Sequence, residues 1–233
     1  MKMKKGYGLR NTNKVLDENV FFSTYYSNDF SFIRLLDKLG GIMFVDAAVL
    51  DELLVTNKFR PILTDLFQRG ILMLCDPENK YSEISDKVEL TDEERSIYRF
   101  ELRNIRSEFN KIEAAKSKAN PNRRKPKNDG EAASLALARV LHLPIICTDD
   151  TSVPHVIKQL ELQIVTNSDS EEKSEFIRTY GLYDLCEELI IGGVVTKTAL
   201  KKIYKNAIKG DRNEEHKLGK FNSIPEPVNI TDK

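Results

Sequence analysis

The stretch that most constrains the fold of this chain is residues 129–150, in which a helical pattern and a buried-strand pattern follow one another. Residues 131–141 are rich in Ala and Leu and contain no helix breaker, which predicts a helix that ends before Pro144. Residues 143–147 are wholly apolar and partly β-branched, as expected of a strand that is covered on both faces of a parallel sheet. The residues that follow this strand are Thr148, Asp149 and Asp150.

Acidic residues at the two ends of this stretch are expected to meet at one edge of the sheet. Open α/β sheets hold their ligands at the carboxyl ends of the strands, which is where Asp149 and Asp150 lie. If the preceding helix packs back against the sheet, Glu131 at its N-terminus reaches the same edge. Two or three carboxylates would then converge from one helix start and one strand end.

The rest of the chain alternates between strand and helix patterns. Further strands are predicted at residues 15–16, 42–45, 71–75 and 162–165, and Asp17 follows the first of them. Helices are predicted at residues 30–39, 49–55, 59–67 and 153–160. This alternation favours a parallel sheet that is covered by helices on both faces, with right-handed connections.

A long insertion, residues 77–128, separates the third strand from the central helix. Thr91 and Glu94 form a capping-box signal at the start of an amphipathic helix predicted for residues 91–116. Residues 116–128 then carry six basic side chains and no acid. Such a run is either a solvated surface or a basic flap that holds the phosphates of a nucleic acid, and the sequence leaves both readings open.

Composition excludes several classes of protein. With 36 basic and 36 acidic residues the chain is not a polycation, so any nucleic-acid surface must be local. Three widely spaced cysteines, Cys75, Cys147 and Cys186, indicate buried reduced thiols rather than a disulfide framework or a zinc site. No apolar run is long enough for a membrane helix and no secretory signal is recognised, so a cytoplasmic protein without a membrane partner is expected.

The acidic residues suit a hard divalent cation. Carboxylate oxygens are the ligands that Mg²⁺ and Mn²⁺ prefer, and such ions also bind phosphate oxygens. The three histidines, His142, His155 and His216, are scattered, and neither a P-loop nor a dinucleotide-binding glycine motif is present. A metal site at the sheet edge is therefore one interpretation. Helix caps and surface acids are the other.

Four short motifs, taken in order, resemble those of PIN-domain nucleases, a family that includes toxin-type ribonucleases. Residues 15–20 resemble the opening Leu-Asp-x-Asn-Val strand of the family, and residues 49–53 resemble its second acidic position on an early helix. Residues 130–138 and 148–150 are similar to its third and fourth acidic positions. The resemblance implies a three-layer α/β/α fold with a central parallel sheet of about 4–5 strands. It also implies a metal-dependent endoribonuclease.

The resemblance also implies roles for individual residues. The catalytic carboxylates would be Asp17, Glu52, Glu131 and Asp150. The ligands of Mg²⁺ or Mn²⁺ would be Asp17, Glu131, Asp149 and Asp150, and the supporting residues would be Asn19 and Thr148. RNA would be held by Arg123, Arg124, Lys125 and Lys127. Because the family often has Asp in place of Glu131, Asp129 is an alternative there. Asp46 and Asp51 are weaker alternatives to Glu52, since Asp46 suits a helix cap.

The chain is longer than the small toxin-type members of this family. The resemblance implies a lead at residues 1–12, a nuclease domain at residues 13–166 and a helical extension at residues 167–208, with helices predicted at 176–191 and 194–208. Residues 209–233 are polar and are predicted to be disordered. The expected partners are RNA and an antitoxin or another protein, and a homodimer remains open. The alternatives in function are a catalytically inactive binding or scaffolding subunit and a DNA-directed nuclease.

Overall fold

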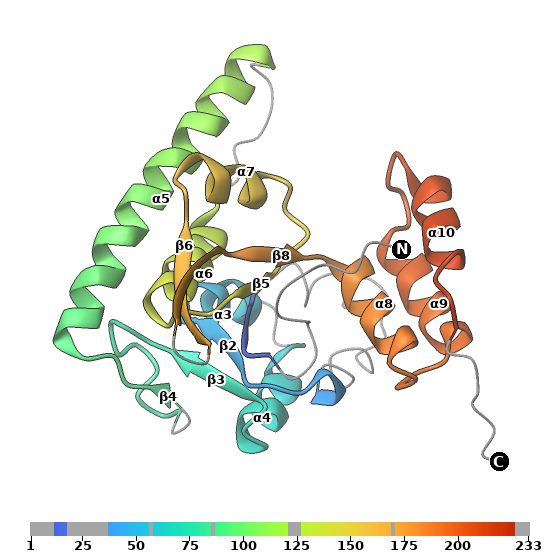
Figure 1. Ribbon diagram of the computed structural model, residues 1–233, viewed down its shortest axis with the longest axis horizontal. Helices are drawn as coiled ribbons and strands as arrows, with labels where there is room; N and C mark the ends of the chain where they lie inside the picture. The colour runs from blue at the N-terminus through green and yellow to red at the C-terminus, as the bar shows by residue number, and fades with distance from the viewer. Residues whose placement is uncertain are drawn as a thin grey trace.

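A central parallel sheet organises the structure, which is a computed structural model that describes residues 12–17, 37–55, 58–84, 87–120, 127–168 and 171–226. In these segments six strands pair in the order β4-β3-β2-β1-β5-β8, and every neighbouring pair is parallel (Figure 1). The strands are β1 (Lys14–Leu16), β2 (Met43–Asp46), β3 (Leu72–Cys75), β4 (Lys87–Val88), β5 (Ile145–Cys147) and β8 (Arg178–Tyr180). The predicted α/β class is thus confirmed, with a sheet slightly larger than expected.

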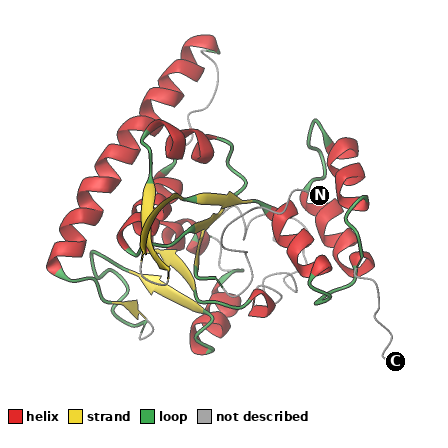
Figure 2. Cartoon of the chain, in the orientation of Figure 1, coloured by secondary structure: helices red, strands yellow, loops and turns green. Residues whose placement is uncertain are grey.

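Helices cover both faces of this sheet, which gives the predicted three layers (Figure 2). One face packs against α3 (Ala47–Leu54), α4 (Arg60–Gln68) and α8 (Leu182–Ile191); α9 (Lys197–Ala207) packs on α8, and α10 (Glu214–Asn222) packs on α9. The other face packs against α5 (Asp92–Ala119), α6 (Asp129–Val140) and α7 (Ser152–Gln159). A short 3-10 helix, η1 (Asp37–Leu39), precedes β2.

The alternation of side chains along the neighbouring strands β1 and β5 decides to which face of the sheet Asp17 points. Val15 and Ile146 lie in the core beneath α5, α6 and α7, whereas Leu16 and Cys147 lie in the opposite core. Successive side chains of a strand point to opposite faces, so Asp17 continues on the side of Val15. The first acid therefore lies on the face that α6 covers.

Helix α6 is the central helix of that face. Its alanines pack closely because they add little bulk, and Ala132, Ala133, Ala136 and Ala138 are all fully buried. The helix lies against β1, β2 and β5 and along the long helix α5. Its N-terminus is thereby held at the carboxyl ends of the strands, as the sequence predicted.

The long helix α5 begins with the predicted capping box. Thr91 Oγ1 accepts from the backbone N–H of Glu94, and the Glu94 carboxylate accepts from the backbone N–H of Thr91. The helix continues to Ala119, beyond the predicted end at residue 116. Lys116 and Lys118 therefore lie on its last turn instead of in a loop, since this stretch contains no breaker before Pro121.

The segment after α7 differs from prediction. Strand β6 (Gln163–Ser168), which was expected to join the parallel sheet, forms an antiparallel hairpin with β7 (Glu171–Phe176) instead. The edge position beside β5 belongs to β8, and helix α8 begins only at Leu182. The predicted helix at 176–191 was too long because its apolar spacing continues through the three-residue strand.

The C-terminal region also differs from prediction. The part of residues 209–233 that the structure describes contains α10, and Phe221 in this helix and Ile224 just after it are 0% and 1% exposed. Phe221 stacks on Tyr204 with ring centroids 4.6 Å apart, which ties α10 to α9. Most of the helix predicted at 30–39 lies outside the described residues.

Two expectations from composition concern the cysteines and membrane-spanning helices. The three cysteines are free and buried, as expected. None of the helices in the described segments combines the length and the apolar character that crossing a bilayer requires.

Candidate active site

Two adjacent strand ends hold the first part of the site. Leu16 of β1 pairs with Cys147 of β5, so the next residues, Asp17 and Thr148, emerge side by side. The backbone N–H of Asp17 donates to the carbonyl of Cys147 at 3.1 Å. Thr148 Oγ1 donates to Asp17 Oδ2 at 2.7 Å, and Asp17 and Thr148 are 0% and 4% exposed. The predicted supporting residue thus fixes the orientation of the predicted first carboxylate.

The two aspartates after Thr148 point in different directions. Asp150 turns towards the face of α6 and α7, and its Oδ1 accepts from the backbone N–H of Ser152 at 2.5 Å. Asp149 turns towards the opposite layer, where its Oδ1 accepts from the backbone N–H of Leu182 at 3.0 Å. The structure therefore brings Asp150 to the site and uses Asp149 at the start of α8.

Helix α3 brings Glu52 to the same place. Asn128, the N-cap residue of α6, makes no side-chain capping bond, and the Glu52 carboxylate accepts from the backbone N–H of Gly130 instead. A carboxylate is favourable there because helix N-termini offer free N–H groups and a positive dipole end. Burial nevertheless raises the pKa of Glu52, and the charges of Asp17 and Asp129 raise it further.

Glu131 is the most perturbed acid of the group. It lies in the first turn of α6, is 6% exposed and accepts from its own backbone N–H. Burial, followed by the charge of Asp17 and those of Asp150 and Glu52, raises the pKa of Glu131 to about 8. A strongly raised carboxyl pKa caused by burial and like charges marks a candidate functional site.

Sequence reasoning missed a chain of contacts that reaches the site from α5. Lys116 Nζ donates to Ser152 Oγ and pairs with Glu113 Oε1, both at 2.9 Å. Ser152 is the residue whose N–H binds Asp150. An Asp side chain often accepts a hydrogen bond from the backbone N–H two residues later, so the contact of Asp150 with Ser152 could have been predicted from the sequence. The contact of Lys116 with Ser152 could not be predicted, because the two residues are 36 positions apart in the sequence.

The alternative acids lie elsewhere. Asp46 caps α3, as its sequence position suggested, with Oδ1 accepting from the N–H of Ala48 at 2.8 Å. Asp51 lies on the surface, where it binds Lys80. Asp129 pairs with Arg106 of α5 at 3.2 Å.

The structure describes only some of the predicted RNA-binding and supporting residues. Asn19, Arg123, Arg124 and Lys125 lie outside the described residues. Lys127 is exposed just before α6, and its charge lowers the pKa of Glu52, in opposition to the burial.

The carboxylates are close enough to interact, but they are not arranged as a finished metal site. Within the described segments, no three His, Cys, Asp or Glu side chains stand at the spacing that holds a metal ion. Asp17, Glu52 and Asp150 are each bonded to a protein donor instead. Like charges at such short range repel, so donors that separate the acids lower the energy of this arrangement.

Comparison of the chain with protein-family models, with curated proteins and with solved structures found no match.

Proposed function

We propose that this protein is a metal-dependent nuclease that hydrolyses the phosphodiester bonds of RNA. The observation that carries the proposal is the gathering of Asp17, Glu52, Glu131 and Asp150 around one edge of the sheet, where burial and the charges of the other three acids raise the pKa of Glu131 to about 8. Packing four carboxylates together is unfavourable unless a cation or a proton compensates for their charge. A site of this kind therefore needs a functional reason.

The donor set fits Mg²⁺ or Mn²⁺. It offers carboxylate oxygens from α3, from α6, from the loop after β5 and from the end of β1, with no thiol or imidazole among the four residues. Asp17, Glu131 and Asp150 would hold the ion, with Glu52 beside them. A bound divalent ion would neutralise charge on the phosphate and lower the pKa of an attacking water.

The residues of the chain would orient the acids and move a proton. Thr148 and the N–H of Ser152 hold Asp17 and Asp150 in fixed directions. A carboxyl group with a pKa near 8 carries a proton at neutral pH, which compensates for part of the crowded negative charge while no cation is bound. Cation binding would favour the ionised form of Glu131 and release that proton.

Support for RNA as the substrate comes from the resemblance to PIN-domain ribonucleases and from nearby basic residues. Lys116 is linked to Asp150 through Ser152, and Lys127 acts electrostatically on Glu52. Ammonium groups at such positions could hold the phosphates on either side of the bond to be cut. Cleavage should then weaken as the salt concentration rises.

The test is cleavage of labelled RNA and of single-stranded DNA by the purified protein with Mg²⁺, with Mn²⁺ and with EDTA. Glu52→Gln and Asp51→Asn form a matched pair, since the residues are adjacent on α3 and only Glu52 faces the site. We expect metal-dependent RNA cleavage that Glu52→Gln abolishes and Asp51→Asn retains.

Other results of this experiment would replace the proposal. Cleavage of DNA alone would favour a DNA-directed nuclease. Absence of cleavage by folded, metal-loaded protein on every substrate would favour a binding or scaffolding subunit. Equal activity of the two variants would remove Glu52 from the site.

A further inference from the structure

Helix α9 carries a basic surface on its outer side. Residues 197–209 contain five lysines and no acidic residue, although the chain as a whole has 36 basic and 36 acidic residues. One of the five, Lys197, donates to the backbone carbonyl of Asn222 at 3.0 Å. The other four are exposed to solvent, and we call them the α9 lysines: Lys201, Lys202, Lys205 and Lys209.

The α9 lysines have no counter-charge in the described part of the chain. Among the described residues, none of the four takes part in an ion pair or a side-chain hydrogen bond. The basic residues of the neighbouring helix α10 are engaged by contrast. Lys217 pairs with Asp211 at 2.6 Å, and Lys220 lies 3.8 Å from the centroid of the Tyr183 ring. The α9 lysines are therefore available to an anion from outside the chain.

The spacing of these lysines is unfavourable for the helix alone. Lys205 is four residues from Lys201 and three from Lys202, so their like charges lie close together on one side of the helix. The negative end of the helix dipole compensates for Lys205 in the last turn. It does not reach Lys201 and Lys202, which lie in the middle of α9. Negative charge from a ligand would remove this repulsion.

The buried side of α9 decides between two kinds of polyanionic partner. Leu200, Ile203 and Tyr204 are 0%, 3% and 3% exposed and belong to the core of the protein. A basic helix that lies on a lipid surface buries its apolar side in the membrane, but in α9 these apolar residues are already covered by protein. A nucleic-acid strand requires only that its phosphates meet positive charges, so the α9 lysines suit RNA better than lipid.

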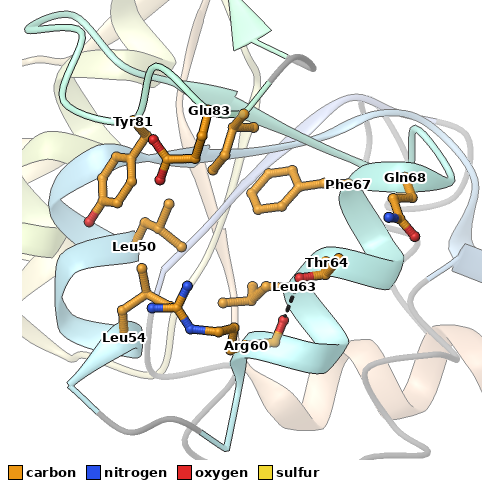
Figure 3. A pocket seen from close by; sticks show the side chains of 10 residues that line it. Leu50, Leu54, Arg60, Leu63, Thr64, Phe67, Gln68, Tyr81 and Glu83 are labelled. Atoms are coloured by element: carbon orange, nitrogen blue, oxygen red, sulfur yellow. Dashed lines mark hydrogen bonds between the residues drawn. The ribbon is translucent and has the colours of Figure 1, made fainter.

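The cavity between α3 and α4 is a poorer fit for a phosphate chain (Figure 3). It has a volume of about 300 Å³, and its lining residues all belong to the described segments. Arg60 is the one cation among them, and Figure 3 shows Glu83 on the opposite side of the cavity. Because a carboxylate repels phosphate, this mixed lining does not select a polyanion as the α9 lysines do.

We propose that the α9 lysines form a second RNA-binding surface, which holds the backbone of the substrate away from the bond to be cut. This inference rests on the proposed function, because it takes RNA as the partner. Figure 1 shows α8 between the sheet and α9, so a strand that contacts both surfaces extends past a helix roughly 10 Å in diameter. Phosphate contacts carry no sequence information, so this surface adds affinity for long RNA without selecting a sequence.

The experiment measures the binding of a long, fluorescently labelled single-stranded RNA to the full-length protein by fluorescence anisotropy. EDTA is present, so binding is measured without metal-dependent cleavage. The α9 variant combines Lys201→Gln, Lys202→Gln and Lys205→Gln. The control variant combines Lys80→Gln, Lys111→Gln and Lys217→Gln, which removes the same charge from surface ion pairs outside α9. Circular dichroism of both variants checks that they fold.

The α9 variant should bind the RNA about tenfold less tightly than the wild type, and the control variant should bind it as the wild type does. The plot of log affinity against log salt concentration should become shallower by about 2 in the α9 variant alone, since each phosphate contact on a single strand contributes about 0.7. Glu52→Gln, which alters the acidic site, should retain the binding that depends on the α9 lysines.

Two results would overturn the inference. The first is equal RNA affinity of the α9 variant and the control variant. The second is binding to vesicles of phosphatidylcholine and phosphatidylserine that depends on the α9 lysines, without binding to RNA, which would assign the surface to a membrane. Failure of the proposed hydrolysis gives a different result, namely RNA binding that depends on the α9 lysines in a protein that cleaves no RNA when metal is added.

Discussion

Thr148 and Asp17 are joined across two neighbouring strands by a buried hydrogen bond of 2.7 Å from Oγ1 to Oδ2. The same hydroxyl oxygen accepts from the backbone N–H of Asp150 at 3.1 Å. One side chain therefore sets the direction of one acid and the backbone position of another. Thr148 thus holds both acids in place at the adjacent ends of β1 and β5.

Thr148→Val should destabilise the protein. The substitution keeps the shape of the side chain but leaves buried Asp17 and the N–H of Asp150 without the hydroxyl, at a cost of about 1–3 kcal/mol. Thr148→Ser keeps the hydroxyl and is the matched control. Urea denaturation measures both variants, and a valine variant as stable as the serine variant would contradict the role given to this hydroxyl.

Asp150→Asn and Asp149→Asn should have different effects although the residues are adjacent. Asp150 faces Glu131, whereas Asp149 bonds to the start of α8. We expect Asp150→Asn to lower the cleavage rate by roughly 100-fold or more and Asp149→Asn to leave it unchanged. Rates measured under identical metal concentrations decide this, and loss of activity in Asp149→Asn would restore Asp149 as a ligand.

The stability of the protein should fall as the pH rises through the range set by Glu131. Its pKa is about 8 in the folded protein and 4.5 ordinarily, so the folded state binds this proton more tightly than the unfolded chain. The proton on Glu131 contributes its full stabilisation of the folded state below about pH 4.5, and this contribution is lost progressively as the pH rises to about 8. Glu131→Gln, which cannot ionise, should be more stable than the wild type at pH 8 by more than about 1 kcal/mol.

Thermal unfolding of the two proteins at pH 5 and pH 8 in EDTA measures this difference. The advantage of Glu131→Gln should nearly vanish at pH 5, where the wild-type side chain is protonated. An equal difference at both pH values would mean that the glutamine acts through packing and that the pKa of Glu131 is not raised.

Tyr98→Phe should cost stability mainly above pH 6. Tyr98 donates to Asp46 Oδ2 at 2.7 Å, and burial raises the pKa of Asp46 to about 6 despite that bond. Removing the hydroxyl leaves a buried carboxylate with one donor fewer, at a cost of about 1–3 kcal/mol when it is ionised. Protonation lessens this cost, so the loss should shrink at pH 5.

Tyr183→Phe provides the control for that variant. Tyr183 donates to Glu187 at 3.1 Å in a less buried setting on α8, and its loss should change stability by only about 0.5 kcal/mol. If Tyr98→Phe and Tyr183→Phe lower the stability equally at every pH, Tyr98 does not stabilise the ionised carboxylate of Asp46.

The parts of the fold that the sequence predicted are those with long, self-consistent patterns. Helix α6 has an unbroken Ala and Leu pattern, and α5 has a complete capping box, so both were found. Strand β8 was missed because its three residues, Arg178, Thr179 and Tyr180, do not form an apolar run like those of β1 and β5. Helix α10 was missed because Phe221 and Ile224 are isolated apolar residues in a polar segment.

The candidate site, like the fold, was predicted only in part. The rule that ligands lie at the carboxyl ends of parallel strands predicted that Glu131 meets Asp149 and Asp150, and the resemblance to PIN-domain nucleases added Asp17 and Glu52. That rule does not give side-chain directions, so it could not distinguish Asp149 from Asp150. Contacts between distant segments, such as that of Lys116 with Ser152, leave no local pattern in the sequence.

The most direct test of the central claim is the binding of Mn²⁺, followed by electron paramagnetic resonance of the free ion as it is titrated into the protein. The account predicts a saturable site in the wild type that Asp17→Asn loses and Asp51→Asn keeps. The absence of a saturable site, or a site that survives Asp17→Asn unchanged, would contradict the assignment of Asp17, Glu131 and Asp150 to a metal centre.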